Sequence, residues 1–117
     1  MADHGPLASK WAERAKAFSD GAADAWDPLF AAGCVWDSLQ GRIEGSAEIQ
    51  SALNEAREAF GWKTHEVVSS SEQDGLVALL GRNIFTNGVT THVAAGVKFV
   101  DGKVTEIRSV GGFPEGG

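Results

Sequence analysis

The chain has 117 residues, of which 43% are hydrophobic and 22% are charged, the composition of one globular domain that can bury its own core. Its formal net charge is -6, and no cluster of lysine and arginine breaks the acidic background, so we expect no nucleic-acid partner. Cys34 is the only cysteine, which excludes an intramolecular disulfide and suits a reducing cytoplasm. No apolar run reaches membrane-spanning length and the first ten residues lack the apolar core of a signal peptide, so we expect a cytoplasmic protein without a membrane partner.

Two helical segments are predicted in the first 30 residues. An apolar stripe with helical spacing ends at the stop signal Asp20-Gly21, which predicts an amphipathic helix over residues 8–19. A shorter helical piece is predicted over residues 24–30, where Pro28 fits only in a first turn.

A short strand and a third helix follow. The strand is predicted over residues 34–38, ahead of a turn that is flanked by glycines. The helix is predicted over residues 46–60, because Ser46 is a good N-cap, the apolar side chains form one stripe, and Gly61 provides a stop.

The second half of the chain has a strand pattern. Hairpin-turn dipeptides at Asp74-Gly75, Asn87-Gly88 and Asp101-Gly102 separate segments rich in valine, threonine, isoleucine and phenylalanine, and they predict an antiparallel meander of four strands. Gly81 and Gly96 lie inside these long strands, where a missing side chain permits a bend, a bulge or the close approach of a ligand. The predicted fold is α+β, with a cone-shaped curved antiparallel sheet whose concave face is closed by about three N-terminal helices. We expect one domain over residues 1–117, with an ordered core of about 8–112.

Three stretches resemble a known superfamily: "DPLFAAGCVW" before and in the first strand, "GRIEGSAEI" at the start of the third helix, and "VKFVDGKVTEIRSV" in the last hairpin. They are similar to the SnoaL-like branch of the nuclear transport factor 2-like superfamily, which includes ketosteroid isomerases, limonene epoxide hydrolases and polyketide cyclases. The resemblance extends from Trp11 to Val110 and implies the fold described above with a pocket on the concave side. The superfamily hosts many chemistries, so the fold alone does not name an activity.

The resemblance also implies that the catalytic groups of these relatives are not matched. The catalytic Asp of the ketosteroid isomerases falls on Ser38, and their oxyanion-hole Asp, like the acidic residue of the cyclases, falls on Ala95. Their oxyanion-hole tyrosine falls near Arg14, in a chain that has no tyrosine. The three charged groups of the epoxide hydrolases fall on Asn83, Gly81 and Ser109.

Alternation along the strands, in the phase that the resemblance implies, predicts which residues face the concave side. These are Trp36, Ser38, Gly81, Asn83, Phe85, Val93, Ala95, Val97, Ile107 and Ser109. The set is mostly apolar with a few small polar groups, as in a small-molecule pocket. The alternative is a filled core in which the three polar side chains satisfy one another.

Asn83 and Asp37 are the candidate catalytic residues. An inward amide at Asn83 can donate a hydrogen bond to a carbonyl or an oxyanion, and the alternative is a purely structural amide. Asp37 is the carboxylate nearest the expected pocket mouth. Regular alternation points it outward, which we favour, whereas a one-residue bulge would turn it inward as a general base.

The remaining chemistry-bearing side chains favour structural interpretations. His65 and His92 have no partner that the sequence reveals and are expected to be partly exposed sheet residues. Trp11 and Trp26 are expected in the core between helix and sheet rather than in a ligand platform. No spacing of His, Cys or carboxylates indicates a metal site, so we expect neither a metal nor an organic cofactor.

The sequence therefore predicts a protein that binds a small, largely apolar organic ligand. It is interpreted as a possible cofactor-independent isomerase, cyclase or hydrolase, and the alternatives are a non-catalytic carrier or sensor and a dimeric interaction module without a working pocket. The outer sheet face, which carries Lys98, Glu106 and Arg108, is expected to form a homodimer, because helices cover only the other face.

Overall fold

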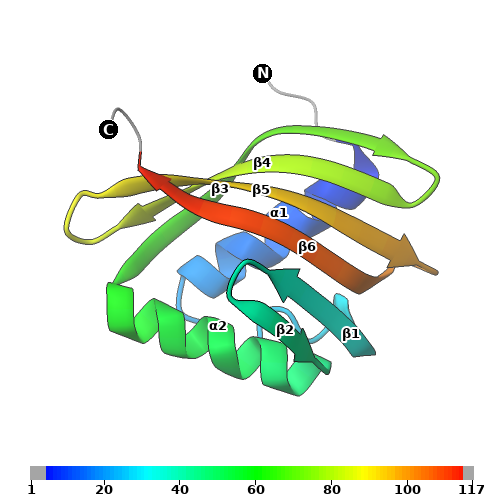
Figure 1. Ribbon diagram of the computed structural model, residues 1–117, viewed down its shortest axis with the longest axis horizontal. Coiled ribbons are helices and arrows are strands. Elements are labelled where there is room, and N and C mark those ends of the chain that lie inside the picture. Colours follow the sequence, from blue (N-terminus) through cyan, green and yellow to red (C-terminus); the bar gives the residue numbers. More distant parts are fainter. Residues whose placement is uncertain (1–4, 115–117) are drawn as a thin grey trace.

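A curved, unclosed sheet with helices on one side forms the protein (Figure 1). The computed structural model describes residues 5–114. Its elements are α1 (Pro6–Ser19), β1 (Phe30–Ser38), β2 (Gly41–Glu44), α2 (Ser46–Phe60), β3 (Trp62–Gln73), β4 (Leu76–Phe85), β5 (Thr90–Val100) and β6 (Lys103–Pro114). The strands follow the order β2-β1-β6-β5-β4-β3, and the predicted α+β class with a curved sheet is confirmed.

The predicted turns connect the strands of the meander. Asp74 and Asp101 have a φ of 52°, and the glycines that follow them, Gly75 and Gly102, have φ of 82° and 79°. Two consecutive residues with positive φ are what a two-residue hairpin turn of type I′ requires. The aspartate-glycine pairs therefore set where β3 turns into β4 and where β5 turns into β6.

Two helices are present among the described residues, instead of the three that were predicted. Residues 20–29 form a series of turns where a helical piece was expected. Here Asp27 N donates to Asp24 O and Leu29 N donates to Trp26 O, both over three residues, and Pro28 has no N–H to donate. The chain therefore enters β1 from a tight turn rather than from a helix.

The N-terminal edge of the sheet also differs from the prediction. The first strand begins at Phe30 rather than near residue 34, and a second strand, β2, pairs with it in an antiparallel hairpin. Strand β1 lies parallel to β6, with a register shift between Phe30 and Val35, so the sheet is mixed rather than purely antiparallel. The β1–β2 hairpin adds a strand at the edge of the sheet that packs against α2.

The start of α1 depends on a side chain from the far end of the sheet. Gly5 precedes the helix and offers no side-chain cap. The carboxylate of Glu72 on β3 accepts hydrogen bonds from Leu7 N at 3.3 Å and Ala8 N at 2.9 Å. A negative charge at this helix end also complements the helix dipole, so Glu72 fixes α1 against β3.

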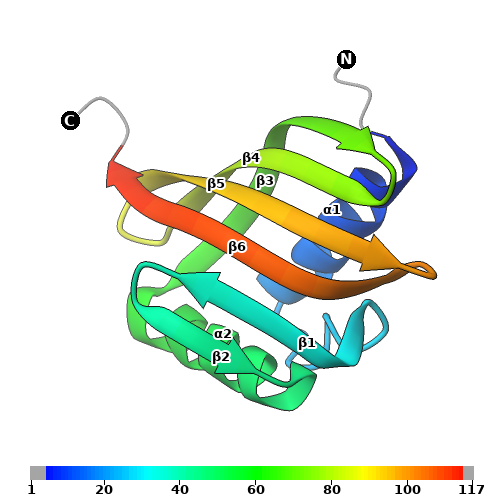
Figure 2. The ribbon, with the colours of Figure 1, turned by 45° about the vertical axis from the view of Figure 1, so that its right-hand side comes forward.

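Both helices lie on one side of the sheet, where α1 packs on β3 and α2 packs on β1 (Figure 2). Between them lies an aromatic cluster in which Trp26 stacks on Phe30, with ring centroids 5.2 Å apart, and contacts Trp11 at 4.6 Å. Full burial of such side chains stabilises a fold by about 2–3 kcal/mol each. No helix in the described part of the chain is long and apolar enough to cross a membrane.

Candidate functional site

A cavity of about 310 Å³ lies between the concave face of the sheet and the two helices. Most residues that were predicted to face inward line it, namely Trp36, Ser38, Asn83, Phe85, Val93, Ala95, Ile107 and Ser109. Val97 and Gly81 were predicted to do so but are not among the lining residues. Val97 is fully buried in the packed core. The cavity therefore lies toward one end of the curved sheet.

Tryptophan side chains make up much of the wall. All four tryptophans of the chain, Trp11, Trp26, Trp36 and Trp62, line the cavity. Trp11 and Trp26 were predicted to be core residues rather than ligand contacts, and the structure gives them both roles, because each is more than 90% buried while it borders the cavity. The site is thus a cavity with largely aromatic walls.

The cavity opens between the β1–β2 turn and the C-terminal end of α2. Leu39 at this turn and Phe60 at the end of α2 line the cavity, yet they are 83% and 66% exposed. Large apolar side chains that are exposed next to a cavity are typical of a ligand entrance.

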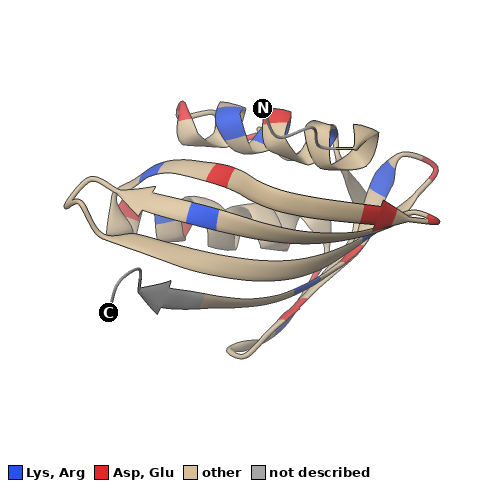
Figure 3. Ribbon diagram, turned by 90° about the horizontal axis from the view of Figure 1, so that it is seen from above, with Lys and Arg blue, Asp and Glu red and all other residues tan. Residues whose placement is uncertain are grey.

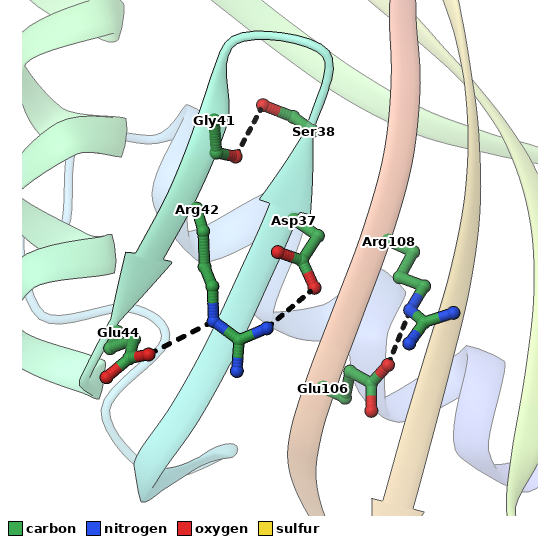
Figure 4. Close-up of polar contacts among 7 residues, drawn as sticks. All are labelled: Asp37, Ser38, Gly41, Arg42, Glu44, Glu106 and Arg108. Carbon is green, nitrogen blue, oxygen red and sulfur yellow. Dashed lines mark hydrogen bonds and ion pairs between the residues drawn. The ribbon is translucent and has the colours of Figure 1, made fainter.

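Two polar groups near this opening are bound to other parts of the protein. The indole N–H of Trp36 donates to Ser109 Oγ at 2.7 Å. The Ser38 hydroxyl donates to Gly41 O at 3.4 Å (Figure 4). It also accepts from Gln40 N at 3.2 Å, and the two hydrogen bonds hold the β1–β2 turn. These three hydrogen bonds reduce what Ser38 and Trp36 can offer to a ligand.

Asn83 contacts a histidine that the sequence left without a partner. His65 on β3 lies opposite Asn83 on β4, and Nδ1 of the imidazole is 2.5 Å from Oδ1 of the amide. On its other side, Nε2 of His65 accepts from the indole N–H of Trp11 at 3.4 Å. His65 is partly buried on a strand, as expected, and the sequence did not reveal its partner because the contact with Asn83 depends on a register shift in β3.

Burial determines the charge of His65. Desolvation lowers the pKa of its imidazole, and the hydrogen bond to Asn83 and the negative charge of Glu66 oppose this only in part. His65 is therefore neutral at neutral pH. Gly81 makes room for the ring, since a Cβ at this position would lie 2.7 Å from Cε1 of His65. The close approach expected at Gly81 was that of a ligand, and the structure places the His65 ring there instead.

Asp37 lies outside the cavity. Its carboxylate is 3.5 Å from Arg42 Nη1, and Arg42 Nε is 3.0 Å from Glu44 (Figure 4). Trp36 and Ser38 on either side of it line the cavity, so β1 alternates regularly there. The orientation that we favoured from the sequence is the one observed, and it leaves Asp37 without access to a ligand in the cavity.

The described residues that line the cavity include no charged side chain. Charged residues lie elsewhere, with lysine and arginine interspersed among aspartate and glutamate (Figure 3). Within residues 5–114, no group of three or more His, Cys, Asp or Glu could hold a metal ion. Burial raises the pKa of the Cys34 thiol to about 11, so this side chain is protonated and packs as an apolar group.

The sequence profile of the SnoaL-like domain matches residues 10–107. The chain belongs to the SnoaL-like domain family. No curated protein matches it.

Solved structures share the fold of this SnoaL-like domain at low sequence identity. It is similar to a LEH-like epoxide hydrolase from M. tuberculosis, at 15% identity over 91% of this chain and 82% of that one, with a TM-score of 0.75. An NTF-2 like protein of unknown function from Burkholderia xenovorans is similar at 18% identity over 95% and 86% of the two chains, with a TM-score of 0.78. A protein from Catenulispora acidiphila with a ketosteroid isomerase-like fold, solved with trimethylamine, is similar at 13% identity over 92% and 85%, with a TM-score of 0.74. These matches confirm the fold that the sequence resemblance implied, and the profile match over residues 10–107 confirms the SnoaL-like family.

Proposed function

We propose that this SnoaL-like domain binds a small, uncharged, largely apolar organic molecule in the tryptophan-lined cavity. The observation that carries the proposal is the lining itself, which combines aromatic walls with an absence of charged side chains among the described residues. A charged ligand would lose its hydration there without gaining a counter-ion, whereas an apolar ligand would exchange water for ring contacts. A volume of about 310 Å³ suits a molecule of two or three fused rings.

Tryptophan fluorescence tests this directly, because all four indoles border the cavity. Naphthalene should change the emission with a saturable one-to-one titration, and 2-naphthalenesulfonate, its charged counterpart, should bind at least about tenfold more weakly. Equal binding of the two probes, or no saturable binding of naphthalene, would contradict the proposal. Native mass spectrometry of the freshly purified protein would identify a retained ligand.

We propose Asn83 as the group that acts on the ligand if the domain is an isomerase, a cyclase or a hydrolase. The amide of Asn83 is a hydrogen-bond donor of the cavity that can stabilise charge developing on a carbonyl or epoxide oxygen, and removing such a donor typically costs 10²–10³-fold in rate. Turnover of ketone and epoxide probes, compared with Asn83→Leu, tests this role. A saturable ligand without turnover would favour a carrier, a function that the absence of an ionised side chain in the described lining also supports.

We further propose that one such domain, acting in the cytoplasm, pairs with a second copy through its outer sheet face. Apolar side chains are exposed there at Leu76, Leu80 and Val110, next to the exposed ion pair between Glu106 and Arg108. A sheet face of this kind, uncovered by helices, is suited to a two-fold contact. Light scattering should show a dimer, and Leu80→Lys should convert it to a monomer. A monomer of the unmodified chain at tens of micromolar would contradict this.

A further inference from the structure

Three side chains form a hydrogen-bonded chain from α1 to the cavity. The indole N–H of Trp11 lies 3.4 Å from Nε2 of His65, and Nδ1 of His65 lies 2.5 Å from Oδ1 of Asn83. These groups differ in what they can donate and accept. Their chemistry therefore fixes the direction of both hydrogen bonds.

The direction is set at Trp11. An indole N–H can donate but cannot accept, so Nε2 of His65 must be the acceptor. A neutral imidazole then carries its proton on Nδ1, and Nδ1–H must donate to the atom of Asn83 that it faces. This atom can only be the amide oxygen, because the opposite orientation of the amide would place one N–H group against another.

The amide N–H groups of Asn83 are then left for the cavity. Within residues 5–114, Nδ2 of Asn83 has no hydrogen-bond partner, and Asn83 is one of the residues that line the cavity. We propose that Trp11 and His65 are positioning residues that hold Asn83 as a hydrogen-bond donor, so that the site takes an uncharged ligand through an accepting oxygen. This inference rests on the proposed function, since it specifies the ligand of the same cavity.

The packing around His65 holds the imidazole in place for this role. Its ring lies over Gly81, where no side chain stands in the way, and its backbone N–H donates to Ser19 Oγ at 3.1 Å. The ring is thus held by β4 beneath it and by Trp11 of α1, while Ser19 of α1 holds the backbone of the same residue. An amide anchored in this way does not need to reorient when a ligand arrives, which favours ketone, ester, ether or epoxide oxygens over ligands that can only donate.

Nitrogen-15 NMR of the imidazole tests the first step without any ligand. We expect His65 to be protonated at Nδ1 and unprotonated at Nε2. Trp11→Phe removes the donor and should allow the second tautomer to appear. The matched control is Trp26→Phe, which removes an indole from the same aromatic cluster, and the Trp26 N–H has no hydrogen-bond partner in the described residues. The control should leave the tautomer unchanged.

The second step is tested with 2-tetralone and tetralin, which differ by one carbonyl oxygen. The ratio of their affinities should favour the ketone most in the unmodified chain and fall by about tenfold in Asn83→Leu, the scale of one hydrogen bond in a desolvated site. Trp11→Phe should lower the ratio in the same direction. Trp26→Phe should change the affinity for both probes together, with the ratio preserved.

The outcomes separate the inference from the proposed function. Binding of both probes with a ratio that Asn83→Leu does not change, or His65 protonated at Nε2, would overturn the positioning role and leave the apolar cavity standing. Binding of neither probe would overturn the proposed cavity function and, with it, the inference. Gly81→Ala provides a separate check, because its methyl group must displace the His65 ring and so should lower the ratio, whereas Gly33→Ala, in a strand with open space around it, should not.

Discussion

A tryptophan placed at Ala95 should fill the cavity, whereas the same residue two positions along β5, at Val97, should overpack the core. Both side chains lie on the concave side of the same strand. Ala95 borders the cavity and is only partly buried, while Val97 is completely buried and lies outside the lining. Comparing the two substitutions therefore tests whether the space between the sheet and the helices is empty.

The two substitutions should change the free energy of unfolding by clearly different amounts. A buried aromatic side chain removes about 150–250 Å² from water, and the lower end of this range contributes about 4 kcal/mol at about 25 cal/mol per Å². Overpacking strain of about 1–3 kcal/mol offsets this at Ala95, so Ala95→Trp should unfold with a free energy within about 1 kcal/mol of the unmodified chain, or higher. At Val97 there is no empty volume to receive the ring, and we expect a loss of more than about 3 kcal/mol.

Thermal unfolding and naphthalene titration together give the answer. Val97→Trp should melt more than about 10 °C below the unmodified chain, and Ala95→Trp should melt close to it. Ala95→Trp should also lose naphthalene binding, because the indole occupies the ligand volume. Equal destabilisation by the two substitutions would show that the space is packed core, and unchanged naphthalene binding in Ala95→Trp would show that the ligand lies elsewhere.

Three further predictions concern features around the site. Glu72→Ala removes the acceptor for two backbone N–H groups of α1 and should lower the free energy of unfolding by about 1–2 kcal/mol in urea titrations, with a smaller loss for Glu72→Gln. Asp37→Asn should change stability by under about 0.5 kcal/mol and leave naphthalene binding intact, because the carboxylate lies on the outer face beside a largely exposed Arg42; a lost ligand would contradict this. Since burial lowers the pKa of His65 from 6.5, the unfolded chain takes up a proton at a higher pH than the folded chain does. Stability should therefore fall as the pH drops below about 6.5, by up to about 1.4 kcal/mol per pH unit, and His65→Phe should remove this slope in urea titrations.

Local chemistry made much of the fold predictable. The aspartate-glycine dipeptides require the positive φ values that the structure shows at Asp74 and Asp101, and Gly61 ends α2 with a φ of 65°, as expected of a helix stop. Pro28 already argued against the helical piece predicted over residues 24–30, and the structure has turns there. The strand β2 was missed because only four residues, Gly41–Glu44, form it, and their pattern equally suits a turn.

Which side chains point toward the concave face was predictable on the strands whose pairing is regular. Trp36 pairs with Ile107 and Ser38 pairs with Ser109, without a shift between them, so alternation in the phase that the family resemblance implied predicted the outward direction of Asp37. Val97 faces the concave side as predicted, but alternation does not tell a cavity from a packed core. That distinction depends on how far the helices stand from the sheet, which is a property of the whole aromatic cluster rather than of one strand.

The contact between His65 and Asn83 depends on a single irregularity that alternation does not show. From the Asp74-Gly75 turn, the pairing of β3 with β4 is regular as far as Ser69 and then shifts by one residue between Val67 and Ser69. If the register of the turn continued unchanged, Glu66 would lie opposite Asn83, and His65 would point to the outer face. The extra residue in β3 exchanges a carboxylate for a neutral imidazole beside the amide. The bulge therefore makes the difference between an anionic site and the uncharged one that the structure shows.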